Sequence, residues 1–425
     1  MEKLTIRHTV KKEAEGSYYA IGFEVPPEVE RVTVSYAYSR LAPGAGKNAG
    51  LINVVDLGLE DASGRFLGWS GSARKSVTVG EFESTNGYLV TGIMPGSWRI
   101  IVGAYKIAPQ GVEVDYEITF TKKAARWFFG DLHMHSDASD GQHTLYELAA
   151  IARRKGLDFI AVSNHNNYAE NLCLPRFPAL TLIPAVEWTH YLGHMNFFGP
   201  KVPFANSFIA NSPGQMLALI DDAKKSGAIV SVNHPKCDFC PYLWGDDTCF
   251  DMIEAWNGPM RRVNLRAIEW WTSLLKSGRR LPIVGGSDFH RDFRYARMGN
   301  PVTAVYARSQ SAAEILAAVA GGHSYITGSV KGVRLGLRCL GKSFGDTVAL
   351  EKGAELTFRA DNAAPGTRLT LVTGEGAFAV FRKRRSRSIT GSATVTKPGF
   401  AYLLATRKVL FYETVCAVSN PIYFE

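Results

Sequence analysis

The sequence has few cysteines and no long apolar segment. Its six cysteines are scattered over 425 residues, so they give no disulfide framework of the kind that holds small secreted domains together. No apolar run approaches the ~20 residues that a transmembrane helix needs, and the charged N-terminus MEKLTIRHTVKKEAEG is not followed by the apolar region of a signal peptide. We therefore expect a cytoplasmic protein with no membrane partner.

One common functional signature is also missing. No GxGxxG follows the first strand of the central region, which argues against an open dinucleotide-binding sheet. The net charge of +9 favours a small anionic, phosphorylated substrate. The densest basic run, 382–387 (RKRRSR), is more typical of an exposed hairpin than of a nucleic-acid surface, so no nucleic-acid partner is predicted. The oligomeric state is left open.

The pattern of apolar residues divides the chain into three predicted domains. Residues 1–123 alternate apolar and polar positions over short stretches separated by turns, which predicts a β-sandwich of about seven strands. Residues 331–425 return to short alternating strands and predict a small C-terminal β-domain. Rigid support of the central domain is the expected role of both.

The central domain, residues 126–330, repeats strand, loop and helix. Apolar residues at helical spacing predict helices, and Gly156, Gly227 and Gly278 just beyond three of them are typical of helix C-termini. The helices are expected at 145–155, 215–226, 265–276 and 312–320. Such βα units favour an α/β barrel over an open sheet.

The motif at 130–141, GDLHMHSDASDG, is the most informative part of the chain. His133 and His135 are two residues apart, so on a strand they project to the same side and can grip one metal ion, and Asp140 follows five residues later. Further candidate ligands lie at or just beyond the ends of other apolar runs. These are His165, Glu187, His194, His234, Asp288 and His290. Strand ends of α/β barrels converge on one mouth, so we expect the nine side chains to meet there.

The order of these segments and their amino-acid motifs resemble those of the polymerase and histidinol phosphatase (PHP) superfamily of metal-dependent hydrolases. The phrases IPAVEWTHYLGHMNFFG, NHP, EAWNG, GGSDFH and SNPIY are similar to its CehA/McbA-type branch, named for a carbaryl hydrolase. The resemblance implies a distorted (β/α)7 barrel at about 127–330 and two or three divalent metal ions, Mn, Fe or Zn. It also implies that all nine side chains fall on metal-ligand positions.

The resemblance further implies how the ligands divide into sites. One site would be formed by His133, His135, Glu187 and Asp288, and a neighbour would share Glu187 with His194 and His234. A third would be completed by Asp140, His165 and His290, which are also the predicted catalytic residues. Such cations lower the pKa of bound water towards about 7, so the expected enzyme is a phosphoesterase that cleaves phosphate mono- or diesters with a metal-bound hydroxide.

Lys236 and Arg291 adjoin the metal motifs and are the predicted ligands of a substrate phosphate. His143 is an outside candidate near the first motif. The remaining histidines, His8, His190 and His323, match no metal position and are interpreted as ordinary structural or surface residues. Cys237 and Cys240 form a CxxC motif with Cys249 nine residues further on; this could be a zinc site, but free thiols or a redox-sensitive pair are favoured.

Two alternatives to a phosphoesterase remain. The first is a carbamate or carboxylic ester hydrolase, in which some of the tryptophans Trp188, Trp244, Trp256, Trp270 and Trp271 would line an aryl pocket. The second is a non-catalytic binding protein on the same scaffold. It is motivated by Asn164, which stands where the superfamily usually has an aspartate and is expected to act behind the ligands, on their orientation.

Overall fold

The computed structural model describes residues 2–44, 50–177, 179–245, 249–293, 296–350, 353–381, 386–409 and 412–425. The chain divides into two compact units, Met1–Ala125 and Arg126–Glu425, and each is described by itself. Residues 382–385, most of the predicted basic run, lie outside the described residues. Among the described residues, no helix combines the length and apolar character that a membrane span requires.

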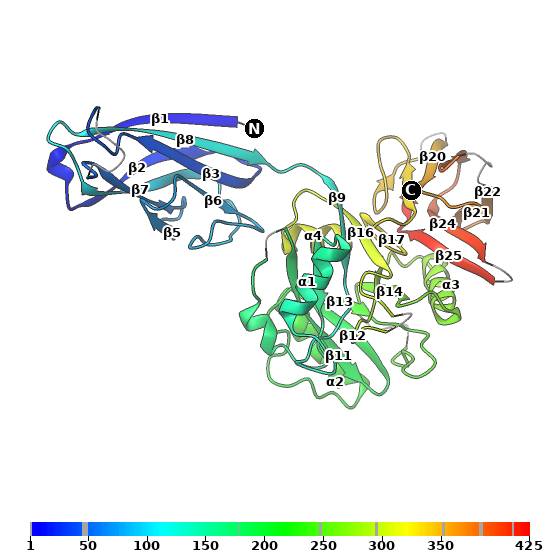
Figure 1. Ribbon diagram of the computed structural model, residues 1–425. Helices are drawn as coiled ribbons and strands as arrows, with labels where there is room; N and C mark the ends of the chain where they lie inside the picture. Colours follow the sequence, from blue (N-terminus) through cyan, green and yellow to red (C-terminus); the bar gives the residue numbers. More distant parts are fainter. Residues whose placement is uncertain are drawn as a thin grey trace. The chain divides into compact units, whose positions relative to one another are not determined.

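The first unit consists of two four-stranded antiparallel sheets with the orders β1-β8-β3-β6 and β2-β7-β4-β5 (Figure 1). A 3-10 turn at Lys12–Ala14 joins β1 to β2. The strands are β1 Glu2–Val10, β2 Tyr18–Val25, β3 Val29–Tyr38, β4 Val54–Glu60, β5 Phe66–Gly71, β6 Ser76–Gly80, β7 Gly96–Lys106 and β8 Val112–Lys122.

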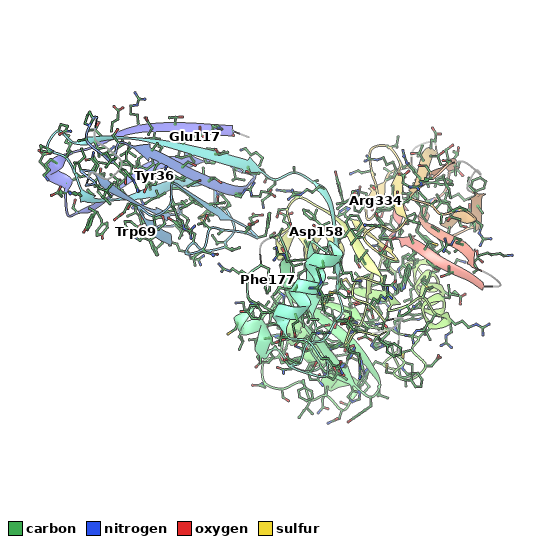
Figure 2. All side chains as sticks on the ribbon, in the orientation of Figure 1. Tyr36, Trp69, Glu117, Asp158, Phe177 and Arg334 are labelled. Atoms are coloured by element: carbon green, nitrogen blue, oxygen red, sulfur yellow. The ribbon has the colours of Figure 1, made fainter. Side chains whose placement is uncertain are left out.

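Alternating burial explains why the two sheets pack together. On β8, Tyr116 and Ile118 are buried whereas the intervening Glu117 is exposed, as expected for a strand with one face on the core. Tyr36 of β3 stacks on Tyr116 with ring centroids 5.8 Å apart. Figure 2 labels Tyr36 and Glu117 among the side chains of this unit. The unit has the two packed sheets expected of a sandwich, with eight strands rather than about seven.

The second unit begins with the α/β region that was predicted as a barrel. Its elements are β9 Arg126–Asp131, α1 Leu145–Lys155, β10 Phe159–Val162, a 3-10 turn Ala169–Cys173, β11 Thr181–His190, β12 Gly193–Phe198, α2 Pro213–Lys225, β13 Ile229–Val232, β14 Met252–Asn257, α3 Arg262–Lys276, β15 Ile283–Gly286, β16 Val302–Ala307, α4 Ala312–Ala320 and β17 Ser324–Thr327. Strands β10, β14, β15 and β17 are buried along their whole length, as in sheets covered on both faces.

The helix predictions agree with the structure because their end signals are local. Thr144 and Glu147 form a capping box at the start of α1, and Gly156 ends it in the left-handed conformation with φ 75°. Helices α1 and α4 have the predicted bounds, whereas α2 and α3 begin two and three residues earlier than predicted.

The strand pairings do not show the predicted distorted (β/α)7 barrel; the fold is mixed α/β and mostly strands. The sheet order is β15-β14-β13-β12-β11-β10-β9-β16-β17, and β11–β12, β12–β13, β9–β16 and β16–β17 are antiparallel. Only Tyr191 and Leu192 connect β11 to β12, which is enough for a hairpin but too short for the crossover helix of a parallel pair.

Side-chain hydrogen bonds connect β15 to the region of β16 and β17, which lie far from it in the order of paired strands. The Thr303 hydroxyl on β16 accepts a hydrogen bond from the Gly285 N–H at 2.9 Å and donates to the Gly285 carbonyl at 2.8 Å. The Asn420 side chain likewise bonds both backbone groups of Ile283 and the carbonyl and hydroxyl of Ser324 on β17.

The C-terminal strands extend the same sheet, so residues 331–425 do not separate as a third compact unit. The reason is that β25 pairs with β17, which makes one sheet of both regions. The strands are β18 Arg334–Arg338, β19 Thr347–Val348, β20 Ala354–Asp361, β21 Thr367–Thr373, β22 Ala377–Phe381, β23 Ile389–Val395, β24 Gly399–Val409, β25 Tyr412–Ser419 and β26 Ile422–Phe424. Strands β18, β20 and β23 form a separate three-stranded sheet.

Candidate metal centre

The chain segments that follow β9 and β15 run side by side and carry four of the nine predicted ligands. His135 N–H donates to the Phe289 carbonyl at 2.9 Å, and Asp288 N–H donates to the His133 carbonyl at 2.8 Å. The fully buried Asp131 carboxylate anchors this pairing by accepting N–H groups from His133, Ser287 and Gly299. These backbone contacts bring the HxH motif against Asp288 and His290.

Glu187, on β11, lies at the centre of the cluster and is only 1% exposed. Its Oε1 is 3.2 Å from His194 Nδ1 and from His234 Nε2, and 3.4 Å from His133 Nε2. Its Oε2 is 2.9 Å from His165 Nδ1 and 3.5 Å from His135 Nε2. Five imidazoles therefore meet one carboxylate; they come from β12 and from the segments that follow β9, β10 and β13.

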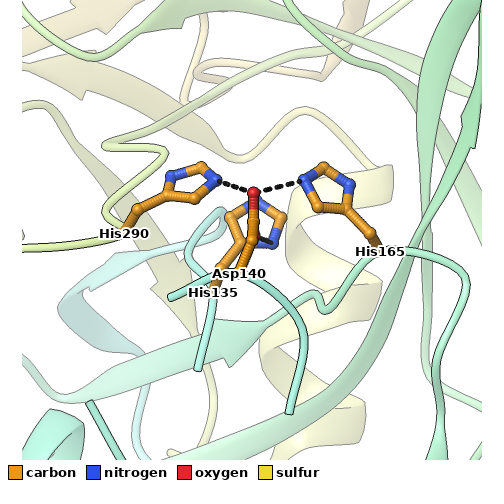
Figure 3. Close-up of side chains that lie close together, drawn as sticks. All are labelled: His135, Asp140, His165 and His290. Carbon is orange, nitrogen blue, oxygen red and sulfur yellow. Dashed lines mark ion pairs between the residues drawn. The ribbon is translucent and has the colours of Figure 1, made fainter. Parts of the chain in front are cut away.

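A second group forms the more exposed part of the cluster, shown in Figure 3. Asp140 Oδ2 lies 3.3 Å from His290 Nε2 and 3.5 Å from His165 Nε2. The rings of His165 and His290 stack on that of His135, with centroids 4.3 and 4.2 Å away. Asp140 is 56% exposed whereas His135 is fully buried, so this group spans from solvent to the interior.

All nine predicted ligands are thus brought together. Ligand atoms within 4.8 Å of one another define overlapping groups that could hold an ion: His135–Asp140–His165–His290, His133–His135–Glu187, His133–His234–Asp288, His165–Glu187–His194 and His194–His234–Cys240. The first contains the predicted third site with His135 added. In the other groups, Glu187, His133 and His234 each belong to two groups, whereas the prediction shared only Glu187 between sites. The ligand role of each residue stays a prediction.

Buried nitrogen atoms without partners test whether a cation fits here. His133 Nε2 and both ring nitrogens of His135 are buried and have no hydrogen-bond partner among the described residues. Leaving such an atom unpaired costs about 1–3 kcal/mol. Imidazole and carboxylate ligands suit divalent cations such as Zn and other first-row metals, so the donor set fits the implied ions.

Electrostatic interactions within the cluster favour a protonated His133 and an ionised Asp288. Burial alone would lower the pKa of His133, but three carboxylates, Glu254 first among them, outweigh burial and raise that pKa well above its ordinary value. Burial would likewise raise the pKa of Asp288, yet His133 and His135 hold it well below its usual range. Protons therefore occupy, in part, the place that cations would take.

Glu254, on β14, is a functional candidate that the sequence prediction did not include. Its Oε1 is 3.0 Å from His133 Nδ1, and its Oε2 accepts the backbone N–H of His234 at 2.9 Å. A carboxylate on the far nitrogen of a ligand histidine fixes the ring orientation and increases its basicity. Glu254 lies in the EAWNG phrase noted above, although nothing local pairs it with His133.

Asn164 contacts the residue next to a candidate ligand; its expected effect on ligand orientation stays a prediction. Its side-chain oxygen accepts the Ser136 N–H at 2.9 Å, and its amide nitrogen donates to Ser136 Oγ and to Glu170 Oε2. Ser136 directly follows His135, so these hydrogen bonds lie next to the HxH segment. An amide can donate to the Glu170 carboxylate, whereas an ionised aspartate at 164 would repel it.

Two residues of the cluster have a backbone conformation that L-residues rarely adopt. His234 has φ 29° and Asp288 has φ 51°. Conformations of this kind cost about 1–3 kcal/mol each and persist where surrounding contacts enforce them, often at functional sites. Here the His234 N–H is held by Glu254, and the Asp288 N–H by the His133 carbonyl.

The predicted substrate ligands have different surroundings. Arg291 is exposed and directly follows His290. The Lys236 ammonium lies 4.6 Å from the centroid of the Trp270 ring on α3, so it is engaged by an aromatic face rather than by the cluster. His143 stacks on Phe289, His8 contacts Tyr19, His190 contacts Leu192, and His323 contacts the Phe344 carbonyl.

A cavity of about 560 Å³ adjoins the cluster at His194. Its lining includes Trp188, Phe208, Phe239 and Cys240. Of the five tryptophans considered for an aryl pocket, Trp188 lines this cavity. The ring centroids of Trp188 and Trp244 are 5.9 Å apart. Trp256 and Trp271 belong to the core.

No protein-family model and no curated protein matches the chain. Among solved structures, similarity is found to a two-domain protein from Bacteroides vulgatus described as containing a predicted PHP-like metal-dependent phosphoesterase. It is 19% identical, with coverage of 70% of this chain and 95% of that chain and a TM-score of 0.41.

A putative metal-dependent phosphoesterase from Bifidobacterium adolescentis is 18% identical, with coverage of 44% and 95% of the two chains and a TM-score of 0.30. An amidohydrolase from Chromobacterium violaceum with bound sulfate and no metal is 14% identical, with coverage of 39% and 89% and a TM-score of 0.27. The first description names the superfamily that the sequence motifs resemble. At these identities and TM-scores the similarity by itself assigns no function.

Proposed function

We propose that this chain is a PHP-type hydrolase dependent on two or three divalent metal ions, and that it cleaves phosphate mono- or diesters. The observation that carries the proposal is the contact of Glu187 with five imidazoles inside a cluster of nine potential ligands. Bound divalent cations would supply Lewis-acid activation of water and of the substrate oxygens.

Different residues of the chain would bind the metal ions, orient their ligands and hold a proton near the substrate. Glu187, His133 and His234 are buried and would hold the ions, with Glu254 orienting His133. Asp140, His165 and His290 form the more exposed part, where a substrate can approach. Asp140 Oδ2 lies within 3.5 Å of the Nε2 atoms of both histidines, so a proton can be held at either nitrogen beside the reacting ester.

Arg291 is the better candidate for holding an anionic substrate group. It is exposed beside His290, and its guanidinium can bind phosphate oxygens bidentately. We assign no substrate contact to Lys236, because its ammonium lies over Trp270.

The cavity beside His194 favours one alternative, a carbamate or carboxylic ester hydrolase. Phe208 and Phe239 offer exposed aromatic surface within it, and such surface suits the apolar group of an aryl ester. The same cavity could accept the leaving group of an aryl phosphate, so the two functions differ in the bond that is cleaved.

The test is a substrate panel on protein loaded separately with Mn, Fe or Zn. Aryl phosphate monoesters, phosphodiesters, carbamates and carboxylic esters share one chromophoric leaving group, so only the acyl or phosphoryl part changes. We expect phosphate ester hydrolysis, with activity and bound metal both lost in Glu187→Gln and both retained in the control Glu269→Gln on the exposed face of α3.

Cleavage of the carbamates or carboxylic esters alone would replace the phosphoesterase proposal by the alternative. Stoichiometric metal without hydrolysis of any panel member would favour a binding protein on the same scaffold.

A further inference from the structure

Two cysteines lie directly beside the candidate metal centre. Cys237 and Cys240 follow His234 in the loop after β13, and their sulfur atoms are 3.2 Å apart. Cys240 Sγ lies 3.6 Å from Nδ1 of His234, whose other ring nitrogen, Nε2, lies 3.2 Å from Glu187 Oε1. One imidazole ring therefore connects the sulfur pair to the metal cluster.

The loop folds back on itself and thereby holds the sulfurs together. The Cys237 N–H donates to the His234 carbonyl at 2.9 Å, and the Tyr242 N–H donates to the Pro235 carbonyl at 3.0 Å. A disulfide bond is about 2.05 Å long, so the two sulfurs need to approach by only about 1 Å. Neither cysteine is committed to another disulfide.

Both sulfurs are accessible enough to react. Cys237 and Cys240 are partly exposed, and Cys240 lines the cavity of about 560 Å³.

Cys240 contacts His234 in the same way that Glu254 contacts His133. In both cases a side chain contacts the Nδ1 atom and leaves Nε2 facing Glu187. The partner of Nδ1 decides which nitrogen carries the proton and therefore which one is free to bind a metal. Changing the chemical state of Cys240 therefore changes the partner that orients His234.

We propose that Cys237 and Cys240 form a redox-sensitive site that reacts with low-molecular-weight disulfides, and that closing the Cys237–Cys240 disulfide weakens metal binding through His234. The metal-binding half of this proposal rests on the proposed function. The cysteine chemistry does not.

The reaction is a two-step thiol–disulfide exchange. Cys237 thiolate attacks one sulfur of the small disulfide, forming a mixed disulfide and releasing one thiolate. Cys240, losing its proton, then attacks the Cys237 sulfur and expels the second thiolate. The two cysteines are oxidised by two electrons, the small disulfide is reduced to two thiols, and these take up the two protons.

The experiment uses the full chain, reduced and loaded with zinc, in buffers with a graded ratio of glutathione disulfide to glutathione. Peptide mass mapping identifies the disulfide, and a chromophoric chelator reports the rate of zinc release without any need for enzymatic activity. We expect a Cys237–Cys240 bond and zinc release faster by about tenfold or more, the range seen when the partner of a ligand histidine is lost. A dithiol reductant should reverse both changes.

Matched variants separate this site from general oxidation. Cys237→Ser leaves Cys240 beside His234 but prevents the disulfide, so zinc release should no longer respond to the glutathione ratio. Cys173→Ser, at an exposed cysteine elsewhere, should respond like the unmodified chain.

Three results would overturn the switch: no Cys237–Cys240 bond at any ratio, a bond that leaves zinc release unchanged, or zinc held by the two thiols themselves so that it blocks their oxidation. Failure of the reduced chain to bind zinc, manganese or iron would instead remove the proposed function and the metal-binding half of this proposal.

Discussion

The carboxylate of Glu254 and the imidazole of His133 are joined by a 3.0 Å contact between Oε1 and Nδ1, while the opposite nitrogen of the ring lies 3.4 Å from Glu187. The ring therefore lies between two carboxylates: Glu254 contacts Nδ1 and can orient the ring, whereas Glu187 lies beside Nε2, the nitrogen that would bind a metal ion. Glu254 also accepts the His234 N–H. One side chain on β14 thus orients two of the candidate ligands.

Replacing Glu254 with glutamine should weaken metal binding by about tenfold or more, because the amide keeps the shape but removes the charge that makes His133 a stronger ligand. Competition with a chelator of known affinity measures this. Glu269→Gln, at an exposed site on α3, is the matched control. Equal affinity in the two variants would show that Glu254 only fills space.

Metal-stripped protein should lose stability as the pH rises above neutrality. Carboxylates, Glu254 among them, hold the pKa of His133 well above 6.5 despite its burial, and the Cys240 and Glu187 contacts do the same for His234. For such groups the stabilisation is fully present below the unfolded value, ~6.5, and is lost as the pH passes through the raised pKa.

Thermal unfolding of stripped and zinc-loaded protein between pH 6 and 9 measures this effect. Cations replace the protons in the loaded form, so its Tm should vary less over this range. A stripped protein whose Tm is flat, or rises with pH in this window, would contradict the ion-pair description.

Thr303→Val should destabilise the second unit by about 2–6 kcal/mol. The isosteric side chain leaves both the N–H and the carbonyl of the buried Gly285 without their partner, and each such loss costs about 1–3 kcal/mol. Denaturant unfolding measures the difference. Thr394→Val, on an exposed position of β23, should change stability little, and a similar loss in both variants would assign the effect to valine itself.

Gly286→Ala should disturb the HxH segment. A Cβ atom at Gly286 would lie 2.4 Å from the Cβ of His133 and 2.7 Å from its backbone nitrogen, so the β9 and β15 segments must move apart. We expect a loss of about 1–3 kcal/mol together with weaker metal binding. Gly214→Ala near the start of α2, where a Cβ meets nothing within 4 Å, is the control, and unchanged metal affinity in Gly286→Ala would contradict this account.

The parts of the molecule that were predicted from sequence are those governed by neighbours along the chain. The bounds of α1 follow from Thr144, Glu147 and Gly156, which act within a few residues. The sandwich strands follow from period-two burial such as that of β8. Among the nine candidate ligands, His133 and His135 were predicted from their spacing. Others, such as His165 and Glu187, were predicted because they lie at or just beyond the end of an apolar run, and strand ends of an α/β sheet converge.

What tertiary structure decided depends on contacts between distant segments. Glu254 is 121 residues from His133, and Asn420 is 137 residues from Ile283, so no local pattern pairs them. The β11–β12 hairpin and the β17–β25 pairing likewise depend on strand partners that no local pattern specifies.

The sequence by itself determined which side chains are available for metal chemistry, because ligand type and strand-end position are both local properties. Only the tertiary structure decided which of them meet at Glu187, which partner orients each imidazole, and that Cys240 lies against His234. These relationships arise when separate strands pack and exclude water from polar groups, which must then find partners in the fold rather than along the chain.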